Sequence, residues 1–199
     1  MQVSFKKTVV IITFPFVAVV TLMMVLCEEK IVLISLFSSF LHELGHLFFM
    51  LLFSAEPSLV SFGAFGIRIE RRAGPILSYN KEAFIALGGI FANCLLSLCG
   101  IILYTVCKSD FGAQLFYVNL LIAAFNMLPV RLLDCGKCLE CVFGSLMSLE
   151  KSEKLLDIIS GMTVVFITLL CVLYNIFVSF NISFIAVCVY IILITTLKE

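Results

Sequence analysis

Long uncharged stretches, separated by short charged connections, run through the whole sequence. An ionised side chain at the centre of a bilayer costs about 2.5 to 3.5 kcal/mol, and a helix needs about 20 apolar residues to cross one. The pattern therefore predicts an all-α polytopic membrane protein with six transmembrane helices. These helices are expected at residues 8–27, 31–53, 83–107, 111–130, 158–174 and 182–197.

Two of these stretches need interpretation. The first could be read as a secretory signal, but it is long for that purpose and no small-residue cleavage site precedes Glu28, so we expect a span. The stretch Ile158–Leu197 is too long for one helix. It is expected to form two helices that turn near Asn175–Asn181, where Asn and Ser residues cluster.

The connection Glu56–Lys81 has the period of a strand. Phe65, Ile67 and Ile69 alternate with glycine and charged residues, and Ala73-Gly74-Pro75 supplies a turn. This pattern predicts a short membrane-associated β-hairpin or edge strand between the second and third spans. A surface loop that merely joins two helices is the alternative.

Composition agrees with a membrane protein. Hydrophobic residues make up 62% of the chain and charged residues 13%, with a mean hydropathy of +1.20, whereas soluble domains hold roughly half apolar and a quarter charged residues. Thirteen basic and thirteen acidic residues cancel, so no nucleic acid partner is expected. Nine cysteines scattered through apolar runs indicate reduced, buried thiols. Residues 1–199 are expected to form one domain.

The basic residues predict the orientation, because Lys and Arg accumulate on the cytoplasmic side. With the N-terminus inside, eleven of the thirteen lie on the cytoplasmic side and only Lys30 and Lys108 lie outside. Both termini, Glu56–Lys81 and Arg131–Asp157 are therefore expected in the cytoplasm. The charge run Glu150–Lys154 is interpreted as a solvated helix face.

Both histidines of the chain lie in His42-Glu43-Leu44-Gly45-His46. On a helix, positions i and i+4 project from one face, so both imidazoles can reach one zinc ion. Glu43 then lies beside the open coordination position, where it can take a proton from water. A pair of hydrogen-bonded core histidines is the alternative, but ionisable residues within a span usually mark a functional site.

A catalytic zinc of this type needs a third protein ligand. Ten of the thirteen acidic residues lie in connections or at the chain's end, which leaves Glu43, Asp134 and Glu140. The second and fourth predicted spans both run toward the cytoplasm, and Pro129 ends the fourth, so Asp134 can return toward His46 on irregular backbone. Glu140 and Cys135, which directly follows Asp134 in the sequence, remain alternative third ligands.

These motifs resemble the site-2 protease family of intramembrane zinc metalloproteases, particularly its small six-span bacterial branch with the sporulation factor-processing proteases. Besides the histidine motif, Asn126, Pro129, Asp134 and Gly136 match the family's second motif, in which Asn precedes Pro by three residues and Asp-Gly-Gly follows. The resemblance implies that Asp134 is the third zinc ligand. It implies a substrate-related or supporting role for Asn126, Pro129 and Gly136.

Further residues follow the same resemblance. The stretch Gly89–Asn93 is similar to the family's Gly-Pro-x-x-Asn segment, with Ile90 where Pro is usual. Asn93 is expected either to bond neighbouring helices or to contact substrate. The expected edge strand contains Gly66 and Ile67. These residues would pair with an extended substrate. Cys135 departs from the family's first Gly, and Leu132 stands where a second Pro is common.

The resulting hypothesis is an enzyme with one Zn²⁺ ion, Glu43 as the base and His42, His46 and Asp134 as ligands. It would cleave transmembrane or membrane-associated protein substrates near the cytoplasmic face of a bacterial cell membrane. No regulatory domain is recognised, so regulation is expected from a membrane partner. A prenyl-protein-processing zincin is one alternative, but the downstream glutamate signature of that class is not found in this sequence. A catalytically inactive relative that acts as a membrane scaffold or chaperone is the other alternative.

Overall fold

The computed structural model describes residues 2–5, 8–26, 29–63, 66–71 and 76–196. Within them it has seven helices and one four-stranded sheet. The chain divides into two compact units, residues 1–125 and 126–199, and each is described by itself. The organisation as one domain stays a prediction.

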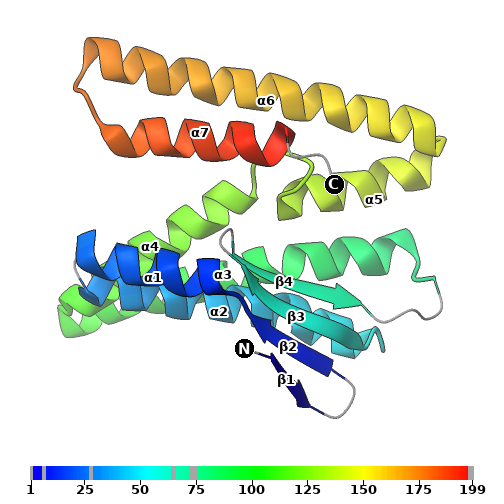
Figure 1. The fold of residues 1–199 in the computed structure, drawn as a ribbon, viewed down its shortest axis with the longest axis horizontal. Coiled ribbons are helices and arrows are strands. Elements are labelled where there is room, and N and C mark those ends of the chain that lie inside the picture. Colours follow the sequence, from blue (N-terminus) through cyan, green and yellow to red (C-terminus); the bar gives the residue numbers. More distant parts are fainter. Residues whose placement is uncertain (1, 6–7, 27–28, 64–65, 72–75, 197–199) are drawn as a thin grey trace. The chain divides into compact units, whose positions relative to one another are not determined.

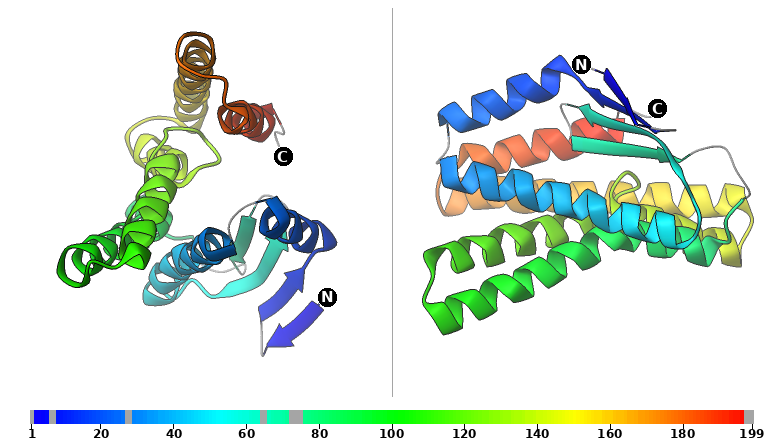
Figure 2. Two further views of the ribbon diagram at one scale, coloured as in Figure 1. Left: turned by 90° about the vertical axis from the view of Figure 1, so that its left-hand side faces the viewer. Right: turned by 90° about the horizontal axis from the view of Figure 1, so that it is seen from below.

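The first unit contains the helices α1 (Phe14–Leu26), α2 (Glu29–Leu52), α3 (Tyr79–Cys107) and nearly all of α4 (Asp110–Asn126) (Figure 1). α2 and α3 confirm helices predicted at 31–53 and 83–107. The two helices cross closely, because Gly45 and Gly88 meet backbone to backbone and a Cβ on either would collide with the other's carbonyl. Small residues permit such close crossings in membranes. α3 and α4 lie side by side, with Gly100 against Gly112 (Figure 2).

The sheet has the strand order β1-β2-β3-β4, with β1 (Gln2–Phe5), β2 (Thr8–Ile12), β3 (Pro57–Gly63) and β4 (Gly66–Arg71). β3 and β4 are antiparallel and pair Val60 with Ile69. They confirm the predicted hairpin between the second and third spans. Of that prediction, Phe65 and the turn 73–75 lie outside the described residues.

β4 lies at the end of the sheet, and the outer side of its backbone can be identified. The carbonyl of Phe62 accepts a hydrogen bond from the backbone N–H of Thr13 at 3.1 Å. The backbone N–H and C=O groups of Phe62 therefore face away from β4. Its partner Ile67 therefore belongs to a pair without mutual hydrogen bonds. Because such pairs alternate, the N–H and C=O groups of Ile67 and Ile69 face away from β3.

The prediction of one helical span over residues 8–27 is wrong at its start. Residues Thr8–Ile12 form β2, which pairs with β3 in parallel, and the helix begins only at Phe14. Two local signals explain the difference: Val and Ile favour strands, and Pro15 fits the first turn of a helix but not its interior. At 1.5 Å per residue, the 13 residues of α1 reach about 20 Å.

The second unit contains α5 (Asp134–Leu146), α6 (Leu149–Phe177) and α7 (Ile182–Thr196). The predicted connection 131–157 is thus largely helical, and α6 begins nine residues before the predicted span at 158. The charge run lies on α6, where exposed Glu150 and Lys154 pair at 2.7 Å, which confirms the solvated helix face. The predicted turn is also confirmed, since the Asn175 side chain accepts a hydrogen bond from the Asn181 N–H at 2.7 Å.

Among the residues that the structure describes, three helices are long and apolar enough to cross a bilayer: Lys30–Leu52, Tyr79–Cys107 and Leu149–Phe177. Their outer faces carry exposed large apolar side chains, among them Phe48, Phe91 and Phe166, which suit contact with lipid. The chain is therefore a membrane protein. α1, α4 and α7 are shorter, with 13, 17 and 15 residues, and the count of six spans stays a prediction.

Candidate metal centre

The two histidines project from one face of α2, as their spacing predicts. His42 is buried, with 6% of its surface exposed, and His46 is half-buried. Their rings meet edge to face, and the two Nε2 atoms lie 3.2 Å apart. The structure thus brings both predicted nitrogen ligands together within the first unit.

Hydrogen bonds on the far side of each ring set the protonation of the pair. His42 Nδ1 lies 2.5 Å from Asn93 Oδ1, and His46 Nδ1 lies 2.7 Å from the backbone carbonyl of Ile85. Carbonyl and amide oxygens only accept hydrogen bonds, so each Nδ1 carries a proton. In a neutral ring, Nε2 then presents a lone pair, and two neutral rings cannot donate to each other through Nε2.

Two lone pairs that converge at 3.2 Å repel each other unless a cation binds them both. Nitrogens that are each about 2.0–2.1 Å from a tetrahedral zinc lie roughly 3.3 Å apart. The separation of the two Nε2 atoms therefore fits two ligands of one zinc ion. The Nδ1 contacts also match the usual second shell of a metal-binding histidine, which donates its other ring N–H to an oxygen.

Gly89 of α3 keeps the space between the two imidazoles open. A Cβ at this position would lie 2.5 Å from His42 Nε2 and 2.5 Å from His46 Nε2. Any larger residue would therefore occupy the region where a shared ion would lie. The motif resemblance included Gly89 but implied no role for it. Its role becomes visible only because Gly89 faces both imidazole rings.

Three buried polar residues that surround His42 complete this part of the centre. Asn93 lies between His42 and Asn119, while Asn119 contacts both the Ser38 hydroxyl at 3.0 Å and the Leu115 carbonyl at 2.8 Å. Sequence reasoning named Asn93 but missed Ser38 and Asn119. A polar amide within an uncharged span was the available signal for Asn119, because such groups usually bond across helices.

Asp134 belongs to the second unit, where it opens the first turn of α5 with 3% of its surface exposed. The loop before it is held against α6: the backbone N–H of Arg131 donates to Ser160 Oγ at 2.9 Å, and the Ser160 hydroxyl donates to the Pro129 carbonyl at 3.3 Å. Lys137 pairs with the Asp134 carboxylate at 3.3 Å. The role of Asp134 as the third ligand stays a prediction.

Gly136 has a steric reason to be glycine. A Cβ there would collide with the carbonyl oxygen of Val130 and lie 2.8 Å from Arg131 Cα. The loop that contains Pro129 therefore folds directly beneath the first turn of α5. Glycine at position 136 therefore permits this close approach. The supporting or substrate-related roles of Asn126, Pro129 and Gly136 stay predictions.

The two rivals of Asp134 have other surroundings. Glu140 pairs with Arg131 at 3.5 Å, and the same guanidinium contacts Asp157 at 3.0 Å. Burial raises the pKa of the Cys135 thiol, and the nearby Cys138 and Asp134 add to the effect. Burial also raises the pKa of Cys138. Both thiols are therefore mainly protonated at neutral pH, as expected of reduced cysteines, but they are only half-buried. The prediction of buried thiols is wrong for Cys94, Cys99 and Cys107, which are exposed.

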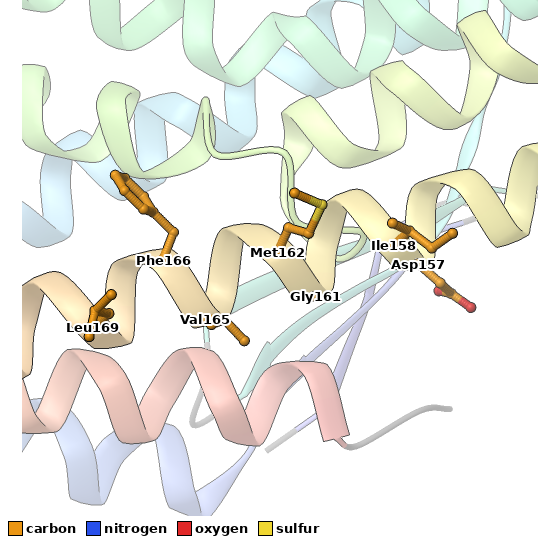
Figure 3. A pocket seen from close by; sticks show the side chains of 7 residues that line it. All are labelled: Asp157, Ile158, Gly161, Met162, Val165, Phe166 and Leu169. Carbon is orange, nitrogen blue, oxygen red and sulfur yellow. The ribbon is translucent and has the colours of Figure 1, made fainter.

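A shallow apolar hollow of about 530 Å³ lies along α6 in the second unit (Figure 3). It is lined by Asp157, Ile158, Gly161, Met162, Val165, Phe166 and Leu169. All seven residues come from one helix, and none was predicted for the site. An apolar face of a spanning helix is suited to lipid contact.

Comparison with solved structures gives an informative likeness. The fold is similar to that of the site-2 protease from Methanocaldococcus jannaschii, with a TM-score of 0.66 and 18% sequence identity, over 96% of this chain and 91% of that one. No protein-family model and no curated protein matches the sequence significantly. The chain therefore has the fold of a site-2 protease. The narrower resemblance to the sporulation branch stays a prediction.

Proposed function

We propose that this protein is an intramembrane zinc metalloendopeptidase of the site-2 protease type. Its substrates would be transmembrane or membrane-associated proteins, cut near the cytoplasmic face. The observation that carries the proposal is the convergence of His42 Nε2 and His46 Nε2 at 3.2 Å on a helix long enough to span a membrane. The similar fold of a known site-2 protease supports it.

His42, His46 and Asp134 would hold one zinc ion. Two imidazoles and a carboxylate form a donor set that suits such an ion, and three protein ligands leave a fourth position open. A bound zinc would polarise the scissile carbonyl and increase the acidity of water. The loop anchored by Ser160 supports the proposal, because it fixes the start of α5 where Asp134 lies.

Glu43 would act as the general base. It follows His42 on α2 and is half-buried. Its carboxylate would accept a proton from the attacking water and later deliver a proton to the leaving amine. Both transfers need a group that takes up a proton and then releases it during the reaction, which a carboxylate can do.

The outer edge of β4 would receive the substrate. A helical substrate hides its peptide bonds in its own hydrogen bonds, so it must become extended before hydrolysis. The outward N–H and C=O groups of Ile67 and Ile69 can pair with such an extended segment by strand addition. Gly66 begins the same strand, and its backbone pairs with Gly63 of β3.

Glu43→Gln tests the chemistry. We expect proteolysis of a candidate membrane substrate to be lost while zinc stays bound, because the amide keeps the shape of the side chain but cannot accept the proton. Zinc content of the purified protein and cleavage are measured on the same sample. His46→Ala is the matched comparison and should lose both zinc and activity.

A Glu43→Gln protein that still cleaves would remove the proposed base. A wild-type protein that binds zinc but cleaves no membrane substrate would favour a membrane scaffold or chaperone.

A further inference from the structure

Three polar side chains without exposed surface lie behind His42 in the first unit. They are Ser38 of α2, Asn93 of α3 and Asn119 of α4, each with 0% of its surface exposed. A buried polar group without a hydrogen bond costs about 1–3 kcal/mol. Their hydrogen bonds form one relay, which ends at the imidazole of His42.

A backbone carbonyl sets the direction of this relay. The Leu115 carbonyl lies 2.8 Å from the amide of Asn119 and can only accept, so the Asn119 atom that faces it is Nδ2. Asn119 Oδ1 then faces Asn93 and accepts from its Nδ2 at 2.8 Å. This leaves Asn93 Oδ1 turned toward His42 Nδ1.

The direction of the relay decides which nitrogen of His42 is protonated. An amide oxygen at Asn93 requires a proton on His42 Nδ1, which leaves the lone pair on Nε2. We infer that Asn119 is a positioning residue: it turns the Asn93 amide so that His42 keeps the tautomer that a metal ligand needs. The consequence for zinc binding rests on the proposed function, whereas the tautomer does not.

The same contacts define what Asn93 does. Its Nδ2 hydrogens point toward Asn119 Oδ1 and toward the Ser38 carbonyl, at 2.8 and 3.5 Å. They are therefore directed away from His42 and from any substrate beside it. Of the two roles expected for Asn93, these contacts favour support of the ligand over contact with substrate.

His46 provides an internal comparison. Its Nδ1 donates directly to the backbone carbonyl of Ile85, with no side chain between them. A substitution at Asn119 should therefore change the tautomer of His42 and leave that of His46 unchanged. A general loss of structure would affect both rings.

The experiment uses the full chain in detergent micelles, labelled with ¹⁵N-histidine and freed of metal. Because His42 and His46 are the only two histidines, the spectrum contains just two imidazoles, which His46→Ala assigns. In the wild type we expect both rings to carry the proton on Nδ1. Zinc affinity is measured separately on the same preparations.

Asn119→Leu keeps the branched shape of the side chain but removes the nearer of the two acceptors that orient Asn93, which leaves only the distant Ser38 carbonyl at 3.5 Å. The Asn93 amide can then turn over and present Nδ2 to His42, which moves the proton to Nε2. We expect a His42 population with protonated Nε2 and a loss of zinc affinity of about tenfold to hundredfold, the usual effect of a lost outer-shell partner.

Asn119→Asp is the conservative variant. A carboxyl group buried this deeply stays neutral, so one oxygen can donate to Leu115 while the other accepts from Asn93. We expect the wild-type tautomer and most of the zinc affinity to return.

Protonation of Nε2 on His42 in the metal-free wild type would overturn the inference without any variant. An unchanged tautomer and unchanged zinc affinity in Asn119→Leu would overturn it too, even if the wild type proved to be a zinc protease. Conversely, a wild type that binds no zinc but shows the tautomer change in Asn119→Leu would uphold the relay and contradict the proposed function.

Discussion

At the scale of single residues, the centre depends on the absence of a side chain at Gly89 as well as on the two histidines. His42 and His46 supply the nitrogen lone pairs, and Gly89 supplies the space between them. Polar partners behind both rings fix their tautomers before any ion binds. Such preorganisation explains why the pair can remain within a membrane helix, where uncompensated polar groups are costly.

Gly89→Ala should weaken zinc binding by roughly tenfold to hundredfold, because the new Cβ would displace both Nε2 atoms. Titration of the metal-free protein with zinc measures the effect. Gly161→Ala is the matched control, since a Cβ there meets nothing within 4 Å, and alanine should stabilise α6 by about 1 kcal/mol. Equal zinc affinities in the two variants would contradict the role assigned to Gly89.

Asp134→Ala should reduce zinc affinity by about a hundredfold or more and abolish cleavage, since a residue that binds the ion directly matters at least as much as one that only bonds to a ligand. Glu140→Gln should change zinc affinity little, because it only weakens a half-exposed ion pair with Arg131. Metal content after dialysis against a weak chelator distinguishes the two. If Cys135→Gly lost the metal while Asp134→Ala kept it, the third ligand would be Cys135.

At the scale of elements, the close crossing of α2 and α3 and the edge strand β4 make different contributions. Gly45 and Gly88 let α3 approach the histidine motif closely enough for Ile85 and Asn93 to reach the rings. β4 is held by β3 along one edge and presents the N–H and C=O groups of Ile67 and Ile69 along its other edge.

Ile69→Pro should impair cleavage without removing zinc. Proline deletes the N–H at this position, which faces away from β3, so the hairpin keeps its internal hydrogen bonds and only the outer donor is lost. Cleavage rate and zinc content are compared with those of Ile69→Val, which retains the N–H and the β-branched shape. Full activity of both Ile69→Pro and Ile67→Pro would show that the outer edge of β4 does not receive the substrate.

At the scale of the whole molecule, charge and hydropathy decide how the chain meets the membrane. Long apolar helices with lipid-suited outer faces place it in the bilayer. The excess of Lys and Arg outside the predicted spans, eleven on one side against two on the other, predicts that the loops around 56–81 and 131–157 face the cytoplasm.

This orientation can be tested with an impermeant maleimide on intact cells. In a variant that retains only Cys107, which is exposed at the end of α3, we expect labelling from outside. In a cysteine-free variant with Glu150→Cys at the exposed start of α6, labelling should require lysis. Labelling of position 150 in intact cells would reverse the proposed topology.

Much of the fold could be predicted because its signals are local. Helices α2 and α3 follow from long uncharged runs, and the hairpin follows from the alternation around Ile67 and Ile69. The start of the chain could not be predicted in the same way. Residues Thr8–Ile12 are as apolar as a span, and their Val and Ile residues suit a strand as well as a membrane helix. Pairing with β1 and with β3, about fifty residues later, makes them a strand.

The sequence by itself determined the membrane class, the two histidines on one helix face and the candidate base, because each depends on residue type and short spacing. Tertiary structure decided the rest: that Gly89 faces both rings, that Asn119 orients Asn93, and that Glu140 pairs with Arg131. The first two contacts join residues from different helices, and the third joins α5 to the loop before it. Local pattern cannot specify them, because packing of the helices determines which side chains meet.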